Sequence, residues 1–206
     1  MYDAKLRLAN LLQKSVANGP EHYYNDVYKK TILEIGFGAG ELLTNLFEQA
    51  NVCYGVDASK LAILELLQKN KKIPAILLDV SLDKLPFQDG HFDYAYMYST
   101  VEYLQNPLFA LMELKRVLKN DGILIINYSV DLPTYTFPGM FTYENMRKFL
   151  NNLYFKVIDE HRDGNFIYQK CENKKVNRME LMDLINNRIE LPDLYDDVQT
   201  PLTLAI

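Results

Sequence analysis

The feature that most constrains this chain is a glycine-rich segment that joins an apolar run to a helical pattern. The apolar run covers residues 32–35, the glycines are Gly36, Gly38 and Gly40, and Glu41 begins the helical pattern. A buried strand that runs through a tight glycine turn into a helix is the unit with which α/β folds hold nucleotides. The sequence therefore predicts a nucleotide-like ligand at this turn, although a tight turn without a ligand would use the same residues.

The spacing of the glycines argues against a dinucleotide. A dinucleotide fingerprint reads G-x-G-x-x-G, and its third glycine would fall at position 41, which is Glu41. A carboxylate on the first helical turn would repel a pyrophosphate docked at that helix terminus. A nicotinamide-dependent oxidoreductase therefore stays an alternative that Glu41 counts against.

Acidic residues stand at three positions around the predicted ligand. Glu34 lies two residues before the first glycine, Asp57 ends a second apolar run, and Asp79 ends a third. The E-x-G-x-G-x-G pattern that begins at Glu34, followed in order by these two acids, resembles the class I S-adenosylmethionine-dependent methyltransferases. Within that class the chain resembles the small-molecule, type 11 branch, and the resemblance covers about residues 30–172.

The resemblance implies that S-adenosylmethionine is the cofactor and that these acids contact it. Glu34 is expected near the methionine amino group. Asp57 is expected to accept both ribose hydroxyls, since a carboxylate has two acceptor oxygens and no donor. Asp79 is expected to accept from the adenine amino group, with the Val80 amide beside the ring. The full set of predicted cofactor-binding residues is Glu34, Gly36, Phe37, Gly38, Gly40, Asp57, Ala58, Asp79, Val80 and Tyr98.

Short apolar runs alternate with helical patterns along the middle of the chain. Strands are predicted near residues 31–35, 52–57, 75–79, 92–99 and 122–128, and helices near residues 40–49, 59–70, 107–118 and 142–152. This alternation predicts a doubly wound α/β fold whose mostly parallel sheet is covered on both faces. Two further runs, at residues 155–160 and 165–171, predict a closing hairpin. The resemblance implies that this hairpin completes a seven-stranded, Rossmann-like sheet with an antiparallel last strand.

Three segments are predicted along the chain. Residues 1–30 are expected to form an N-terminal helical lid, in which Tyr23 and Tyr24 either fold over the cofactor or pack as ordinary aromatic residues. Residues 31–172 are expected to form the methyltransferase domain. Residues 173–206 are expected to form a helical extension and tail, whose apolar stripe either packs on the domain edge or binds a partner, such as a second copy in a homodimer.

Composition limits the classes of function. The chain has 206 residues, a formal net charge of −5 and a sequence pI of about 5.3, which argues against sequence-independent nucleic-acid binding. It shows no apolar run of about 18 residues and no leader pattern, so we expect no membrane association and a cytoplasmic location. Cys53 and Cys171 lie in strand-like runs without metal-ligand spacing, and we expect buried thiols and no metal.

No catalytic residue is identified from the sequence. Relatives that act on small molecules often read Glu-His after the fourth strand, whereas this chain reads Glu102-Tyr103, which counts against a histidine base at that position. The chain has three histidines, His22, His91 and His161, and of these His91 and His161 are expected at the surface. A base is needed only where the methyl acceptor arrives protonated with a high pKa.

The expected function is transfer of a methyl group to an oxygen or nitrogen of a small molecule, mainly by positioning and desolvation. The Asn-Pro-Pro-Tyr and Pro-Cys motifs of other methyltransferase branches are absent. Tyr98, Glu102 and Tyr103 are weak candidates for substrate contacts, and the aromatic residues within 128–141 form either a substrate wall or a hydrophobic cap. The alternative is a catalytically silent, cofactor-binding regulatory or scaffold subunit with the same fold.

Overall fold

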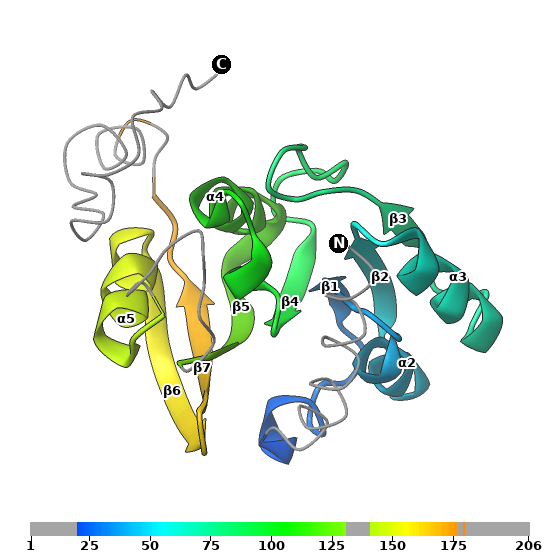
Figure 1. The fold of residues 1–206 in the computed structure, drawn as a ribbon, viewed down its shortest axis with the longest axis horizontal. Coiled ribbons are helices and arrows are strands. Elements are labelled where there is room, and N and C mark those ends of the chain that lie inside the picture. Colours follow the sequence, from blue (N-terminus) through cyan, green and yellow to red (C-terminus); the bar gives the residue numbers. More distant parts are fainter. Residues whose placement is uncertain (1–19, 131–140, 177–178, 180–206) are drawn as a thin grey trace.

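The computed structural model describes residues 20–130, 141–176 and 179. Its centre is a seven-stranded sheet with the strand order β3-β2-β1-β4-β5-β7-β6 (Figure 1). The strands are β1 (Thr31–Ile35), β2 (Val52–Asp57), β3 (Ala75–Leu77), β4 (Phe92–Tyr98), β5 (Leu118–Ser129), β6 (Phe155–Asp163) and β7 (Phe166–Asn173). β1 to β5 pair in parallel, whereas β7 is antiparallel to both β5 and β6. The predicted doubly wound, seven-stranded sheet with an antiparallel last strand is therefore confirmed.

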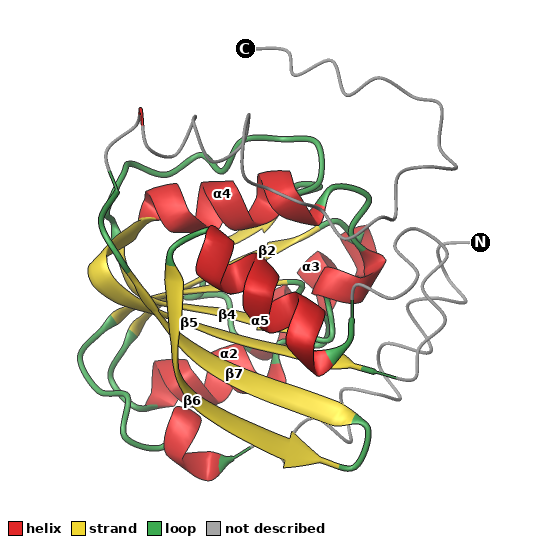
Figure 2. Cartoon of the chain, turned by 90° about the vertical axis from the view of Figure 1, so that its left-hand side faces the viewer, coloured by secondary structure: helices red, strands yellow, loops and turns green. Residues whose placement is uncertain are grey.

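Helices cover both faces of this sheet (Figure 2). They are η1 (Glu21–Tyr23), α2 (Glu41–Glu48), α3 (Lys60–Lys69), η2 (Val101–Tyr103), α4 (Pro107–Val117) and α5 (Tyr143–Asn152). Side chains of α4 and α5 pack into one hydrophobic core, and those of α2, α3 and η1 pack into a second core. Because the central parallel strands are buried on both faces, their sequences are apolar almost throughout.

Local sequence determines where the helices begin. The Ser59 hydroxyl accepts a hydrogen bond from the Ala62 amide at 3.4 Å, and the Asn106 side chain accepts one from the Phe109 amide at 3.0 Å. Pro107 occupies the first position of α4, where its missing N–H leaves no helical hydrogen bond unmade. These two N-caps start α3 and α4 soon after the chain leaves β2 and β4, and so they fix the loops at that edge of the sheet.

β3 is shorter than the sequence predicts. The strand ends at Leu77 rather than reaching Asp79. The Asp79 carboxylate accepts a hydrogen bond from the Ser81 amide at 2.9 Å, and the Asp79 carbonyl accepts one from the Asp83 amide at 2.9 Å. An aspartate that binds the backbone two residues ahead turns the chain, so Asp79 stands in a loop rather than in a strand.

β5 is longer than the sequence predicts. It begins at Leu118, which pairs with Phe92, and the pairing resumes only where Ile123 faces Tyr94. Residues 119–122 therefore form an irregularity within the strand, where the prediction placed a turn before the strand.

Aromatic packing makes His91 less exposed than the predicted surface position implies. His91 is half-buried, with its ring stacked on Phe87 at 6.2 Å between centroids and set edge-on to Phe92 at 4.8 Å. His91 is therefore only partly exposed, whereas His161 is exposed as expected, and His22 is exposed too.

Tyr23 packs in the core rather than in a lid. Its side chain is fully buried, and its carbonyl accepts a hydrogen bond from the Tyr96 hydroxyl at 2.8 Å. Of the two expectations for Tyr23, packing as an ordinary aromatic residue is therefore correct, while Tyr24 is half-buried. Both predicted buried thiols, Cys53 and Cys171, are buried and free.

Some predicted features lie outside the described residues. They are the N-terminal helical pattern up to residue 18, residues 131–140 of the aromatic segment, and almost all of the C-terminal extension after residue 176. The two described ends of the aromatic segment, Tyr128 and Phe141, are buried in the core.

Arg116 of α4 holds the loop between β3 and β4. Its guanidinium donates to the Leu85 carbonyl at 2.9 Å and to the Phe87 carbonyl at 2.8 Å, and it forms ion pairs with Asp89 at 2.7 Å and Glu113 at 2.6 Å. A planar fork with five donors can make these bonds at once, whereas an ammonium group cannot.

We therefore expect Arg116→Lys to lower the free energy of unfolding by about 1–3 kcal/mol, because backbone carbonyls of the loop lose their donors. Urea titration followed by circular dichroism measures the change. Arg162→Lys, at an exposed position of the β6–β7 hairpin, is the matched control and should change stability several times less. Equal effects of the two substitutions would contradict the anchoring role of Arg116.

Candidate cofactor-binding site

The turn after β1 contains three glycines with positive φ. The angle is +69° at Gly36, +53° at Gly38 and +72° at Gly40. A Cβ atom on Gly36 would lie 2.2 Å from Thr100 Oγ1, and one on Gly40 would lie 2.6 Å from Leu66 Cδ1. The turn therefore admits no side chain at Gly36 or Gly40, and its backbone lies directly against the segment that follows β4.

Asp57, the last residue of β2, binds the glycine turn. Its Oδ2 accepts from the Gly38 amide at 2.9 Å, and its Oδ1 accepts from the Ser59 amide at 2.8 Å. Burial raises the pKa of Asp57, and the two N–H groups oppose that rise. Because each carboxylate oxygen has a second lone pair, Asp57 can still accept from two hydroxyl groups of a ligand.

Glu34 is buried beside the same turn, with 3% of its surface exposed. Burial raises the pKa of Glu34 well above its ordinary value and the charge of Asp57 raises it further, whereas the Leu43 N–H in the first turn of α2 lowers it. Within the described part of the chain, Glu34 Oε2 has no hydrogen-bond partner. An unsatisfied buried acceptor costs about 1–3 kcal/mol, and a ligand that carries a donor would remove that cost.

Tyr98 ends β4 next to Glu34. Its ring contacts Tyr96 at 5.9 Å and Tyr168 at 6.0 Å between centroids, and its hydroxyl is buried without a partner among the described residues. Burial raises the pKa of Tyr98, and the nearby Tyr168 and Glu34 raise it further. Tyr98 and Glu34 therefore lie near each other at the carboxyl ends of the adjacent strands β4 and β1.

For four other predicted cofactor residues, the structure shows no contact that points to a ligand. Asp79 is half-buried in the loop after β3, Ala58 is exposed after Asp57, and the Val80 side chain is in the hydrophobic core. The Phe37 side chain is also buried in the core, so only its backbone borders the turn. The sequence motif located these positions in the chain but did not show which of their atoms face the site.

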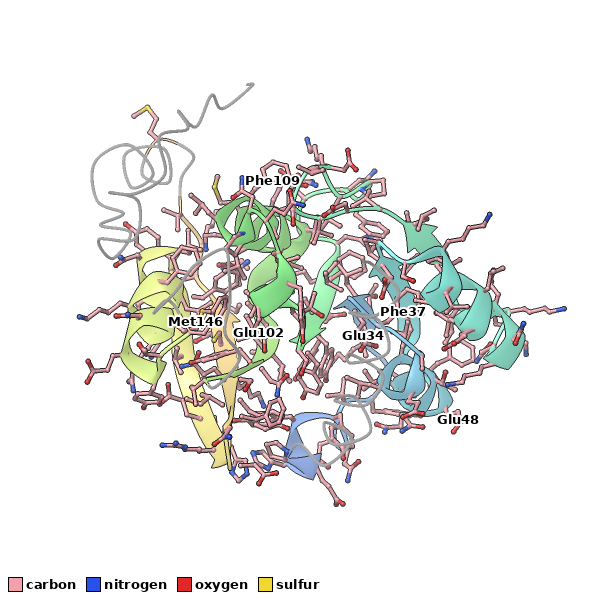
Figure 3. The ribbon with its side chains drawn as sticks, viewed as in Figure 1. Glu34, Phe37, Glu48, Glu102, Phe109 and Met146 are labelled. Atoms are coloured by element: carbon pink, nitrogen blue, oxygen red, sulfur yellow. The ribbon has the colours of Figure 1, made fainter. Side chains whose placement is uncertain are left out.

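A second group of buried polar atoms lies at the same edge of the sheet and centres on Glu102 of η2. Glu102 is 4% exposed, and its Oε1 accepts from the Ser129 amide at 2.7 Å. Across the described ranges, Glu102 Oε2 and the hydroxyls of Tyr103 and Tyr128 have no hydrogen-bond partner. Figure 3 labels Glu102 and Glu34 in the middle of the molecule, past the end of β4 and on β1 respectively.

The environment of Glu102 changes its acid–base behaviour. Burial raises the pKa of Glu102 to about 7, while its own N–H and that of Ser129 oppose the rise. Burial raises the pKa of Tyr103 and of Tyr128, and the charge of Glu102 contributes to both shifts. The sequence made Glu102 and Tyr103 only weak candidates, because burial and unsatisfied atoms cannot be read from a single sequence.

Among the described residues, no group of three or more His, Cys, Asp or Glu side chains could hold a metal ion. No helix among them has the length and apolar character that crossing a bilayer requires.

The fold and the glycine turn are similar to those of class I S-adenosylmethionine-dependent methyltransferases, a class whose cofactor is S-adenosylmethionine. The model of the family described as a methyltransferase domain matches residues 33–126. This segment, which contains most of β1, all of β2 to β4 and most of β5, is the part of the chain that is similar to the type 11 methyltransferase domain.

Known proteins share this domain over different lengths. The uncharacterized protein MJ1123 of Methanocaldococcus jannaschii is 34% identical over 94 residues, which are 46% of this chain and 42% of that protein. The chain thus spans about two fifths of the length of the curated relatives it matches, which are 42% and 39% covered.

Two solved structures share the fold. A SAM-dependent methyltransferase from Aquifex aeolicus has a TM-score of 0.59 and 22% identity, covering 71% of this chain and 83% of that chain. A chain from the complex between the Haloferax volcanii Trm112 methyltransferase activator and a methyltransferase has a TM-score of 0.71 and 13% identity, covering 85% of this chain and 97% of that chain.

The raised pKa of Glu102 has a consequence for stability that needs no ligand. Its pKa is about 7 in the folded protein against 4.5 when unfolded, so the folded protein binds the proton more tightly. Stability is therefore highest below the unfolded pKa and falls as the pH rises toward the folded value.

We expect the free energy of unfolding of the wild type to fall by about 3 kcal/mol between pH 4.5 and pH 8, relative to Glu102→Gln. Glutamine keeps an acceptor for the Ser129 amide but does not ionise. Urea unfolding at several pH values measures the difference, and parallel curves for the two proteins would contradict the raised pKa.

Proposed function

We propose that the whole protein is an S-adenosylmethionine-dependent methyltransferase that acts on an oxygen or nitrogen of a small molecule. The observation that carries this proposal is the pairing of Asp57, whose carboxylate holds the glycine turn and keeps free lone pairs, with the unsatisfied Glu34 Oε2 beside it. The first suits two ribose hydroxyls and the second suits an ammonium group.

The residues present fit this cofactor. Glu34 supplies a buried carboxylate for the methionine amino group, where a charge-assisted hydrogen bond is stronger than a neutral one. Gly36, Gly38 and Gly40 have no side chains that would hold a ligand away from the backbone, and the Phe37 side chain between them is buried in the core. Asp79 supplies a carboxylate in the loop after β3 for the adenine amino group. When bound, the cofactor supplies an electrophilic methyl group on a sulfonium.

The protein's contribution to transfer is mainly positional. A methyl acceptor must approach the sulfonium in line, and a site that excludes water keeps the acceptor as the main nucleophile. Tyr98 and Glu102 are both buried at the carboxyl end of β4, and we expect their side chains to line the site of the methyl acceptor. The predicted cytoplasmic location and a C-terminal role in dimer formation remain part of this proposal.

The alternative is a cofactor-binding subunit without turnover. One structural neighbour is a chain in a complex with a methyltransferase activator, but that similarity concerns the fold alone and does not favour the alternative. Glu102, a buried carboxyl with one unsatisfied oxygen next to the proposed cofactor site, favours an active enzyme because a silent scaffold does not need that group.

We expect the wild type to bind S-adenosylmethionine and S-adenosylhomocysteine in calorimetric titrations, and not NAD. Asp57→Ala should weaken that binding at least about 100-fold, because two hydrogen bonds to a charged acceptor are lost. Asp57→Asn keeps one acceptor oxygen, so its affinity for the cofactor should lie between that of the wild type and that of Asp57→Ala. Asp83→Ala, at an exposed acid in the loop after β3, is the control and should bind as the wild type does.

A methyl-transfer assay distinguishes the proposed enzyme from the alternative of a silent subunit. The protein is incubated with S-adenosylmethionine labelled in its methyl group and with a small-molecule extract of the source cells. We expect label in a small product, and none when Asp57→Ala replaces the wild type. Cofactor binding without any labelled product, from extracts and from protein or RNA fractions alike, would favour the scaffold.

A further inference from the structure

Glu102 is held in place in a way that leaves one oxygen for a ligand. It lies in η2, directly after β4, and its Oε1 is fixed by the Ser129 amide at the end of β5. The side chain is 4% exposed, and its Oε2 has no partner within the described residues. Buried carboxylate oxygens normally have hydrogen-bond partners, so Oε2 is a defined acceptor that a bound donor would satisfy.

The charge of Glu102 itself indicates which ligand this oxygen suits. Glu102 takes part in no ion pair of the described residues. Uncompensated carboxylates disfavour an anionic acceptor and favour a cation.

The other unsatisfied groups near Glu102 are phenols. The Tyr103 and Tyr128 hydroxyls are buried without partners in the described part, and the charge of Glu102 contributes to the raised pKa of each. Phe141 packs against Tyr128 with 6.2 Å between ring centroids. Aromatic rings beside a carboxylate are an environment that attracts an ammonium group, which carries donors and no acceptor.

We propose that Glu102 binds the methyl acceptor through a protonated amine and takes its proton, so that the acceptor is a small aliphatic or benzylic amine. This inference rests on the proposed function and narrows its oxygen-or-nitrogen acceptor to nitrogen. It differs from a purely structural role, in which Glu102 would only hold the Ser129 amide in place.

The proton and electron balance of the step is simple. One N–H bond of the ammonium breaks, and an O–H bond forms on Glu102 Oε2. The lone pair left on nitrogen then forms a bond to the methyl carbon, while the carbon–sulfur bond breaks and its electron pair stays on sulfur. A base with a pKa of about 7 suits this transfer near neutral pH. The titratable groups that its charge reaches are Tyr103 on η2 and Tyr128 on β5.

Calorimetry on protein saturated with S-adenosylhomocysteine tests the inference with three probes that share one ring: benzylamine, benzyl alcohol and benzoate. We expect benzylamine to bind at least about tenfold more tightly than benzyl alcohol, and benzoate not to bind. Glu102→Gln, which keeps the acceptor for Ser129, should weaken benzylamine binding at least about tenfold. Wild-type affinity for benzylamine should rise about tenfold from pH 6 to pH 8, as Glu102 ionises, and the variant should lose that dependence.

Glu113→Gln is the matched control, since Glu113 is a buried carboxylate whose oxygens accept from Arg116 and from the Leu85 amide. It should leave benzylamine affinity unchanged even if it lowers stability. Equal binding of benzylamine to wild type and Glu102→Gln, binding of benzoate as tight as that of benzylamine, or no benzylamine binding at all would each overturn the inference. Failure to bind S-adenosylhomocysteine would instead overturn the proposed function, and this inference with it.

Discussion

The site depends on one carboxylate that joins two loops. Asp57 accepts from the Gly38 amide in the turn after β1 and from the Ser59 amide at the start of α3. The bond to Gly38 connects the end of β2 with the turn after the neighbouring strand β1. It holds the backbone of the glycine turn in the position where a ligand would contact it. The turn can pack directly against Thr100 only because Gly36 carries no Cβ; a Cβ there would lie 2.2 Å from Thr100 Oγ1.

Around this fixed turn the protein leaves two buried carboxyl groups with an unpartnered oxygen. Glu34 lies on β1 and Glu102 lies past the end of β4, and each has one buried oxygen that no described residue satisfies. Burial disfavours the ionised form of both groups and so raises the pKa of each. Two such carboxyls at adjacent strand ends give the site two separate positions for cationic donors, one beside the glycine turn and one beside Ser129.

Much of the fold could be predicted from the sequence, because apolar periodicity reports burial on both faces of a parallel sheet. The strand at residues 52–57 matches β2 to the residue. The errors fell where local hydrogen bonding overrides periodicity: Asp79 turns the chain through the Ser81 amide, and Leu118 already pairs with Phe92. Neither contact has a signature in apolar spacing.

The candidate site was only partly predictable. The motif identified Glu34 and Asp57 because their role depends on distance along the chain from the glycines. It could not show that the Phe37 side chain points into the core, nor that His91 stacks on Phe87, since both depend on packing between distant segments. The importance of Glu102 also depends on an unsatisfied atom in three dimensions.

The raised pKa of Glu34 links ligand binding to proton release. In the free protein burial favours the protonated carboxyl, with the charge of Asp57 adding to that effect. An ammonium group beside Oε2 would favour the ionised form by a nearby opposite charge, and the Leu43 N–H already acts in the same direction. Binding a cationic amino group must then expel the proton of Glu34, and the affinity for that group increases with pH until the carboxyl is ionised in the free protein. The same group that destabilises the empty fold thereby adds to the selectivity for a cationic ligand.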